Sequence, residues 1–528
     1  MPQNNSPHDV FISYSRKNKD IVLPIKEEIE RTLGLRCWID LSDIPCGSEN
    51  FKRKVIPGIR ETRIAFLFFL SAESQASEYA IKEIGFASKR ANKRVILIRF
   101  NDDDMTDDFY FDFQNADIID WRVPEQKGKL LRDLANWVSQ CSVHCSSGAI
   151  CENDETAKVW AALRDPEKAC LVQIASAVRV AIGEAFGMKP GELTTGKIYA
   201  ALRKLGFDKV FDTNFSADVM IMEDVTEFIK RFTEQKDLPL ITSCCPACTD
   251  WMEKNAPDFT GNLSTAKSPQ QMLSALCKSY WAEKNGFGHT KIHVTSIMPC
   301  TAKKHEIAHD EFMGATVTQD TDVVLTTREL ACMIKADGID FASLPEENAD
   351  DLLGSYTGAG AIFGVTGGVT EAALRTAYCI ITAEHAPPSI EFQAVRGMNG
   401  VKTVTIDIKG VKVSIAIAHE MDNVKKVLDM IREDRKNGVR PRFDFIEVMA
   451  CRGGCIGGDG QPCLATDEVL AQRMAGLYID DEKRKLRMSH LNPEVAALYA
   501  DYLDGKTGVQ GGEKAHHLLH TKHKKGVR

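Results

Sequence analysis

Cysteines gather in three stretches of the chain whose residue types suit a metal cluster. In the last of them, Cys451 and Cys455 lie among five glycines and a proline. Glycine weakens helices and strands, so a run of it is expected where backbone wraps closely around something bulky. Two buried thiols in a turn would explain one such stretch, but three favour an iron–sulfur or metal cradle. The stretches are Thr242–Pro246, Met298–Glu306 and Glu447–Pro462.

Together these stretches resemble the signature sequences of the iron-only (diiron) hydrogenases, and they stand in the order of that family. The resemblance covers residues from about 155 to 520. Between and beyond the cysteines it is carried by Phe211–Asp218, Met222–Glu227, Leu263–Gln271, Ile362–Glu371 and Glu513–His520.

The resemblance implies a cofactor, the H-cluster, which joins a 4Fe-4S cubane to a two-iron unit. The diiron unit carries carbon monoxide, cyanide and a bridging dithiolate. Cys455 would bridge the two parts, Lys303 would donate to a cyanide as a point charge, and two methionines would pack soft sulfur against the irons. The implied cubane ligands are Cys245, Cys300, Cys451 and Cys455. The implied pocket residues are Lys303, Met298, Met449, Gln270, Ser268, Ala175 and Ser176.

Four positions depart from the family pattern. Ser176 stands in place of proline, and its hydroxyl could donate to the second cyanide. Cys248 replaces a tryptophan. Asp459 replaces a glycine, which puts a Cβ and a charge near the bridging cysteine. Asp224 replaces a glutamate and is shorter by about 1.5 Å, one carbon–carbon bond, a gap that a water could fill.

A proton path is also implied by the family positions. Cys244 stands where the family has its proton donor, a task that suits a thiol with an ordinary pKa of about 8.5; a second cluster ligand is the alternative. Asp224, Glu227 and Arg231 recur at spacings of three and four, so they share one helix face. An ordinary surface ion-pair ladder has the same spacing. Ser264 completes the path.

Residues 8–140 alternate short apolar runs with helical patterns, which predicts a doubly wound, flavodoxin-like parallel sheet in an α/β domain. Near-continuous apolar strands indicate burial on both faces. Several stretches resemble a TIR domain, and Glu83 would then be its NAD-cleaving position. A solvated glutamate, in a domain that only associates or senses nucleotides, is the favoured alternative. The stretches are Phe11–Ser15, Trp38–Gly47, Phe66–Ser71 and Ser77–Glu83.

Residues 141–160 are small and polar without periodicity, as expected of a linker. Cys141, Cys145 and Cys151 lie there, and we interpret them as incidental thiols rather than a fourth site. Residues 161–528 are predicted to form a larger, two-lobed α/β catalytic domain with the cluster between its lobes and a small-subunit-like segment at its C-terminal end.

Composition excludes several classes of function. The net charge of −8 argues against nucleic acid as a partner, and the most apolar run, Ile64–Leu70, is too short to cross a membrane. The N-terminal residues lack the pattern of a signal peptide. Sixteen cysteines without such a signal favour cluster chemistry over disulfides. A cytoplasmic protein without membrane partners is therefore expected.

The sequence thus predicts reversible reduction of protons to dihydrogen. Electrons would come directly from a soluble carrier, ferredoxin or flavodoxin, because no ferredoxin-type cysteine run precedes the catalytic part. Maturation proteins would build the diiron unit, and the TIR domain could self-associate. Two alternatives remain: a hydrogen or redox sensor coupled to TIR signalling or NAD cleavage, and a non-catalytic iron–sulfur assembly homologue.

Overall fold

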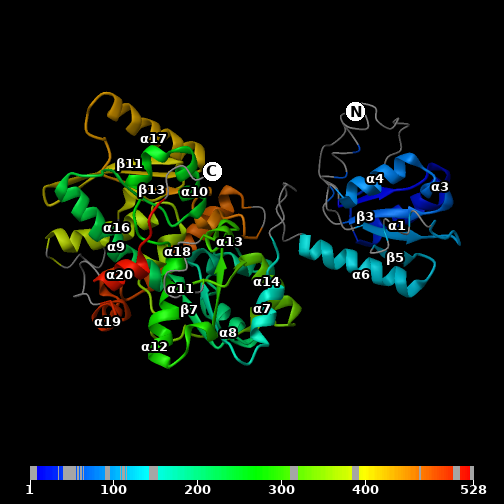
Figure 1. Cartoon of the computed structure of the whole chain (residues 1–528), viewed down its shortest axis with the longest axis horizontal. Helices are drawn as coiled ribbons and strands as arrows, with labels where there is room; N and C mark the ends of the chain where they lie inside the picture. Colours follow the sequence, from blue (N-terminus) through cyan, green and yellow to red (C-terminus); the bar gives the residue numbers. More distant parts are fainter. Residues whose placement is uncertain are drawn as a thin grey trace. The chain divides into compact units, whose positions relative to one another are not determined.

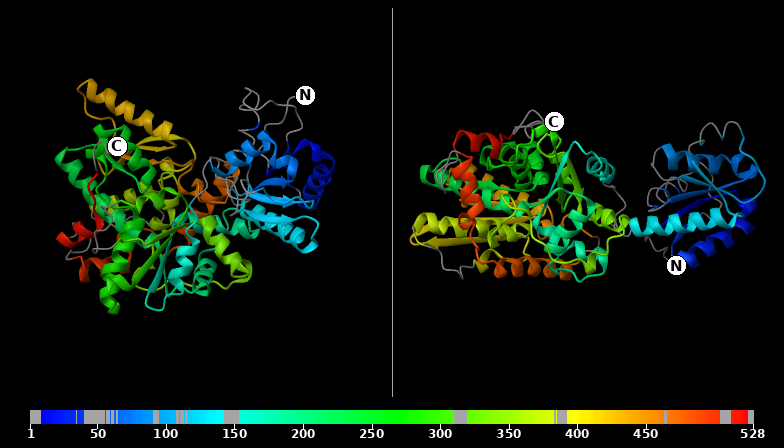
Figure 2. Two further views of the ribbon diagram at one scale, coloured as in Figure 1. Left: turned by 45° about the vertical axis from the view of Figure 1, so that its right-hand side comes forward. Right: turned by 90° about the horizontal axis from the view of Figure 1, so that it is seen from below.

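The chain folds into two compact units, residues 1–152 and 153–528 (Figures 1 and 2). The second unit begins at Asn153, and its first helix, α7 (Thr156–Leu163), starts within the range predicted as linker. The computed structural model describes residues 9–33, 35–39, 55, 59, 62, 65–89, 95–106, 109, 113, 116–141, 153–309, 319–382, 384, 392–462, 465–503 and 512–523. Part of Trp38–Gly47, together with Cys145 and Cys151, lies outside the described residues.

The first unit is built on a five-stranded sheet in which every neighbouring pair is parallel, in the order β2-β1-β3-β4-β5. This is the flavodoxin-like order, and the predicted fold class is confirmed. The strands are β1 (Val10–Ser13), β2 (Cys37–Ile39), β3 (Ala65–Leu70), β4 (Val95–Arg99) and β5 (Asp117–Asp120). The helices are α1 (Lys19–Leu33), α3 (Ala72–Gln75), α4 (Glu78–Lys89) and α6 (Pro124–Cys141).

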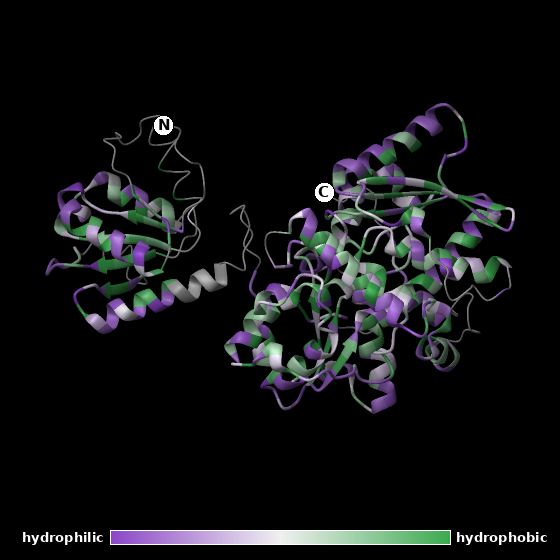
Figure 3. Cartoon of the chain, turned by 180° about the vertical axis from the view of Figure 1, so that it is seen from behind, coloured by the Kyte–Doolittle hydropathy of each residue, from purple (hydrophilic) through white to green (hydrophobic). Residues whose placement is uncertain are grey.

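Both faces of this sheet are buried, as its apolar strands predict. Leu67 and Phe69 of β3 pack with residues of α1 and α6, whereas Phe66 and Phe68 pack with residues of α4 on the opposite face. Alternate residues of a strand point to opposite faces, so the continuous run of β3 supplies both cores. Figure 3 shows the strands of this sheet as mainly hydrophobic.

The second unit contains two four-stranded sheets. One is wholly parallel, in the order β10-β9-β6-β7; the other, β11-β12-β13-β8, has one antiparallel pair at its edge. The first sheet comprises β6 (Ala169–Ile174), β7 (Lys209–Asp212), β9 (Ile292–Met298) and β10 (Val323–Thr326). The second comprises β8 (Leu240–Thr242), β11 (Val401–Ile408), β12 (Val411–His419) and β13 (Phe445–Met449).

Helices pack around both sheets (Figures 1 and 2). Besides α7 they are α8 (Thr195–Leu205), α9 (Thr213–Glu234), α10 (Pro246–Asn255), α11 (Pro269–Leu276), α12 (Ala282–Asn285), α13 (Ala302–Glu306), α14 (Thr327–Ala336), α15 (Gly358–Ala361), α16 (Gly368–Thr382), α17 (Met421–Lys436), α18 (Asp467–Lys483), α19 (Pro493–Asp501) and α20 (Glu513–Leu519). No helix in the described part of the chain is both long and apolar enough to cross a membrane.

Buried charges join α16 to α18 beside these sheets. The Arg375 guanidinium is fully buried and lies 2.8 Å from Asp481 and 2.7 Å from Glu371. Charges withdrawn from water need such close partners. The network therefore holds α18 in place against α16.

Candidate active site

A cavity lies where loops from both sheets meet. The loops directly follow β6 and β9 of one sheet, and β8 and β13 of the other. Loops at the carboxyl ends of parallel strands are a common place for ligand sites. Its wall includes Ala175, Ser176, Cys244, Cys245, Gln270, Met298, Cys300, Lys303, Met449, Cys451 and Cys455. All four predicted cubane ligands are thus brought together in one wall.

Burial beside other thiols raises the pKa of three cysteines in this wall, Cys300, Cys451 and Cys455. Burial and the neighbouring Cys245 raise the pKa of Cys451 to about 12, and burial with the same neighbour raises that of Cys300. Several thiolates side by side therefore repel one another unless a cation lies between them. Four cysteines around one cavity are the donor set of an iron–sulfur cluster. The residues present fit the cubane that the sequence implies.

Glycines let the last cysteine loop close tightly. A Cβ at Gly458 would lie 2.3 Å from the Pro299 carbonyl oxygen, beside Cys300. Gly454 has a φ of +97°, and a Cβ there would lie 2.8 Å from Met449 Sδ. Positive φ and such close approach both require glycine. The glycine run therefore brings the loop that carries Cys451 and Cys455 against the loop that carries Cys300.

The cavity also holds buried polar groups suited to small anionic ligands. Lys303 is buried, and its Nζ lies 3.0 Å from Glu306 Oε2. Gln270 Nε2 donates to the same oxygen at 2.9 Å, which leaves Gln270 Oε1 buried without a partner among the described residues. Ser268, predicted as a pocket residue, is not among the residues that line the cavity; it precedes α11, and its buried hydroxyl has no partner among the described residues. Unsatisfied buried polar atoms are rare in native proteins, so they mark a place for a further ligand.

Ser176 uses its hydroxyl within the protein. It donates to the Ala361 carbonyl at 2.7 Å and accepts from the Gly364 amide at 3.1 Å. Ser176 therefore joins the loop after β6 to the segment after α15, and its wider role toward a second cyanide stays a prediction.

The predicted relay residues Asp224, Ser264, Glu227 and Arg231 form a connected network of hydrogen bonds and an ion pair. Asp224 is buried on α9, and its carboxylate accepts from Ser264 Oγ and Thr242 Oγ1, each at 2.5 Å. Burial raises the pKa of Asp224 to about 6, against the opposing effect of these two hydroxyls. Ser264 Oγ also lies 3.3 Å from Glu227 Oε2. Within the described residues, the Asp224 oxygens bond to these two hydroxyls rather than to Cys244.

The outer end of the network reaches the surface. Glu227 pairs with Arg231 and accepts from Thr265 N and Oγ1, both at 3.0 Å. Glu227 and Arg231 line a separate surface pocket together with His520. Thus the network leads from the buried Asp224 carboxylate, through Ser264, to Glu227 at a surface pocket.

Two departures from the family pattern have clear surroundings. Asp459 is exposed and accepts from the Thr301 amide at 3.0 Å, so its side chain turns outward while its charge still raises the pKa of Cys300 and Cys451. Cys248 is fully buried, its Sγ lies 3.7 Å from Met421 Sδ, and its closeness to Cys245 is the largest cause that lowers the pKa of Cys245, to about 6.

The sequence did not indicate several groups in this network. Thr242 holds Asp224, Glu306 pairs with Lys303, and His520 lies 3.0 Å from Glu223 Oε2 and 2.8 Å from Thr265 Oγ1. Glu306 had a signal, because positions three apart on a helix are neighbours. The others pair across distant segments. In the first unit, the predicted NAD-cleaving residue, Glu83, lies on α4 and is partly exposed.

Known families match nearly all of the described chain. The family described as iron only hydrogenase large subunit, C-terminal domain, matches residues 168–459, which are 292 of the 528 residues. The iron hydrogenase small subunit family matches residues 467–526, and the TIR domain family matches residues 10–132.

Two individual hydrogenases are also similar to this chain. The NADP-reducing hydrogenase subunit HndD of Solidesulfovibrio fructosivorans is 46% identical over 389 residues, which cover 72% of this chain and 64% of that protein. Iron hydrogenase 1 of Clostridium pasteurianum is 42% identical over 385 residues, 71% of this chain and 65% of that protein. The chain thus spans slightly less than two thirds of the length of these two relatives.

A solved structure extends the likeness to three dimensions. The apo FeFe-hydrogenase HydA1 of Chlamydomonas reinhardtii, solved as a variant, matches with a TM-score of 0.62 and 38% identity, over 71% of this chain and 100% of that one. Because one family covers more than half of the residues and the solved fold agrees with it, this chain belongs to the iron-only hydrogenases and carries a TIR domain in its N-terminal unit.

Proposed function

We propose that this protein catalyses the reversible reduction of protons to dihydrogen with electrons from a soluble carrier. The observation that carries the proposal is the cavity whose wall joins five cysteines, four in the ligand positions of the family and one, Cys244, two residues after Thr242, whose hydroxyl bonds to the buried Asp224. A protein that only binds an iron–sulfur cube would not need a relay of carboxylates and hydroxyls from the cavity to solvent.

The residues around the cavity would hold the H-cluster that the family implies. Cys245, Cys300, Cys451 and Cys455 would be the cubane ligands. When bound, the H-cluster supplies the electrons and the open iron position at which hydrogen is made or split. Lys303, buried yet paired with Glu306, would present its cationic end to a cyanide. Gln270 also lines the cavity, and its side-chain oxygen has no partner among the described residues.

The chain's own part in the reaction is to move protons. Cys244 would deliver a proton to the open iron position and regain it from the interior of the protein. Glu227, Ser264 and Asp224 would pass the next proton inward. Ser264 Oγ lies 3.3 Å from Glu227 Oε2 and 2.5 Å from Asp224 Oδ1, so each step spans one contact. A carboxyl whose pKa is about 6 can both hold and release a proton near neutral pH. Arg231 would position Glu227 at the surface end.

The electron donor would be ferredoxin or flavodoxin, with maturation proteins supplying the diiron unit, and the location would be cytoplasmic. The name of the Solidesulfovibrio relative includes NADP reduction, but this chain covers only part of that protein. A direct comparison of hydrogen evolution with reduced ferredoxin, reduced flavodoxin and NADPH would identify the donor. Turnover with NADPH alone would argue against a soluble protein carrier.

The central test is hydrogen evolution from reduced methyl viologen after reconstitution with a synthetic diiron unit. Wild type is compared with Cys244→Ala, and infrared bands of carbon monoxide and cyanide report loading in both. We expect strong activity in wild type and its loss in the loaded variant. A loaded wild type that barely turns over would favour a sensor, and the absence of infrared bands would favour an assembly homologue.

The TIR domain would serve association between copies or nucleotide sensing. The alternative, NAD cleavage coupled to hydrogen, requires a carboxylate that reaches a ribosyl group, and Glu83 is partly exposed on α4. NAD consumption by the full chain under hydrogen and under argon, in wild type and Glu83→Gln, separates the two. Equal NAD levels under both gases would exclude the coupled activity.

A further inference from the structure

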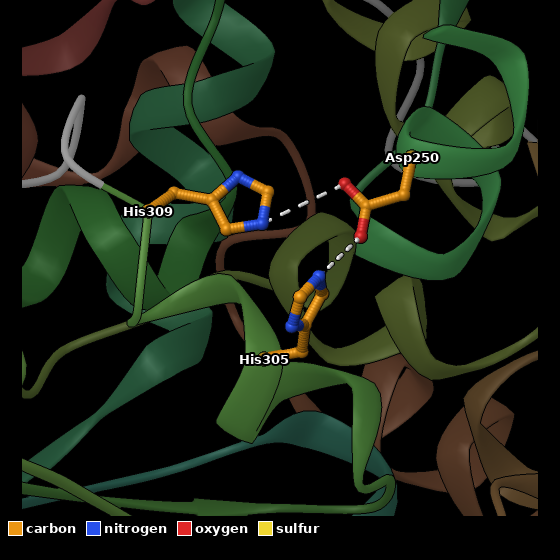
Figure 4. Close-up of side chains that lie close together, drawn as sticks. All are labelled: Asp250, His305 and His309. Atoms are coloured by element: carbon orange, nitrogen blue, oxygen red, sulfur yellow. Dashed lines mark ion pairs between the residues drawn. The ribbon is translucent and has the colours of Figure 1, made fainter. Parts of the chain in front are cut away.

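Two histidines and an aspartate meet on the surface of the second unit, outside the cavity described above. His305 Nε2 lies 3.3 Å from Asp250 Oδ2, and His309 Nε2 lies 3.9 Å from Asp250 Oδ1. Figure 4 shows the two rings directed at different oxygens of the one carboxylate. One ligand atom from each residue can be chosen so that all three lie within 4.8 Å of one another. Such convergence is unusual for exposed side chains with no shared task.

The three residues lie on α10, on α13 and just after α13, next to the cysteine loops. Asp250 is on α10, which begins at Pro246, directly after Cys245. His305 is on α13, which begins two residues after Cys300. His309 follows α13 by one helical turn, so the two imidazoles lie on the same side, with ring centroids 4.8 Å apart. A ligand held by all three would tie together the two segments that carry Cys245 and Cys300.

Two imidazoles and one carboxylate form a ligand set for divalent transition metals. Zinc is bound by such nitrogen and oxygen atoms at about 2.0–2.2 Å, and three protein ligands leave a position for water. Ligand atoms around a tetrahedral zinc therefore lie about 3.4 Å apart. His305 and Asp250 already have this spacing, and His309, at 3.9 Å from the other carboxylate oxygen, would move closer when the ion binds. His305 is 60% exposed, which leaves a path for the ion.

The electrostatic surroundings also favour a cation. Burial raises the pKa of Asp250, with a smaller contribution from Glu253, and the two histidines and Lys254 oppose it. The carboxylate thus lacks full compensation when the imidazoles are neutral. A divalent ion would supply that charge without requiring either ring to be protonated.

We propose that Asp250, His305 and His309 bind a divalent transition-metal ion of the zinc class, separate from the cluster cavity. The ion clamps α10 to α13 and so fixes the relative position of the loops that carry Cys245 and Cys300. Binding does not depend on hydrogen turnover, so this site can be tested whatever the activity of the protein.

The test is zinc binding by the full chain with its cubane reconstituted, so that the cavity cysteines are occupied. Anaerobic equilibrium dialysis against zinc, followed by metal analysis, gives zinc and iron per chain. The variants are Asp250→Asn and the double variant His305→Ala/His309→Ala. His289→Ala, which removes a partly exposed histidine elsewhere in the same unit, is the matched control.

We expect wild type and His289→Ala to hold one zinc more than the double variant, with iron unchanged. Asp250→Asn should bind this zinc at least about tenfold more weakly, since even residues that only support metal ligands cost about 10–100-fold. X-ray absorption at the zinc edge should show that this zinc has nitrogen and oxygen neighbours. Equal zinc in wild type and the double variant, sulfur neighbours for the extra zinc, or zinc uptake that releases iron would each overturn the proposal.

Discussion

Replacing Asp224 with asparagine should separate stability from catalysis. The change removes the proton-carrying group but keeps its shape, and its two hydrogen-bond partners are hydroxyls that can either donate or accept. If Asp224 accepts and releases the transferred proton, its loss should lower hydrogen evolution by about 100-fold or more. This is the lower end of what positioned acid–base groups contribute. That corresponds to about 2.7 kcal/mol in the activation barrier.

Stability should change in the opposite direction. The pKa of Asp224 is about 6 in the folded protein against an ordinary value of 3.8. The folded state therefore binds the proton more tightly than the unfolded state, and stability falls as pH rises from about 4 to about 6. The difference amounts to about 3 kcal/mol at 1.36 kcal/mol per pKa unit. Asparagine carries no charge, so the Asp224→Asn variant should gain up to about 3 kcal/mol above pH 7.

The assay pairs methyl-viologen hydrogen evolution from pH 5 to 8 with urea unfolding at pH 5 and 8. Wild-type evolution should fall as pH rises through about 6, and the variant should have a flat, low profile. Asp224→Glu, which restores the longer side chain of the family, should keep the activity. A fully loaded Asp224→Asn protein with more than a tenth of wild-type turnover would refute the relay. Unchanged stability at pH 8 would refute the assignment of its pKa.

Three further predictions concern the cluster cradle and the packing around it. In Cys248→Ala, loss of the buried thiol that lowers the pKa of Cys245 should make the cubane potential more negative by roughly 20–60 mV, the equivalent of about 0.5–1.5 kcal/mol for one electron; an unchanged potential in redox titration would contradict this. In Arg375→Met, the partly uncompensated Asp481 should cost about 3–5 kcal/mol of stability in urea, and a loss under 1 kcal/mol would be inconsistent with burial of the pair. In Gly458→Ala, the backbone clash should lower iron per chain after reconstitution, whereas Gly288→Ala, which has open space around it and an ordinary negative φ, should load fully.

The fold was largely predictable because its signals are local. The run Ala65–Leu70 is continuous and apolar, and it becomes the strand buried on both faces of the first sheet. The ligand cysteines were predictable from residue type, glycine content and family resemblance. Thr242 and Cys248 were not predicted as partners of Asp224 and Cys245. Their roles depend on which side chains come into contact after the chain has folded. No local sequence pattern predicts those contacts.

Asp459 shows most clearly where prediction from residue type stops. In the sequence its charge stands four positions after Cys455, which suggested disturbance of that cysteine. In the structure the side chain points outward and accepts from Thr301, the residue that follows Cys300. The carboxylate therefore joins the loop after β9 to the loop after β13. Spacing along the chain limits how far apart two residues can lie. The direction of a side chain depends on the φ and ψ angles of its loop, and tertiary contacts determine those angles.

The cavity forms where the loops at the carboxyl ends of parallel strands in one sheet meet the corresponding loops of the other sheet. Each cysteine loop comes directly after a short apolar strand: β8 before Cys244, β9 before Cys300 and β13 before Cys451. Carboxyl ends of parallel strands lie at one edge of a sheet, so loops within a sheet must meet there. β8 and β13 are paired neighbours, which brings their cysteines together. β9 belongs to the other sheet, and the cavity therefore exists only because the two edges face each other. Strand patterns in the sequence do not predict that the two edges face each other. In the structure, the close packing of Gly458 against Pro299 holds the two edges together.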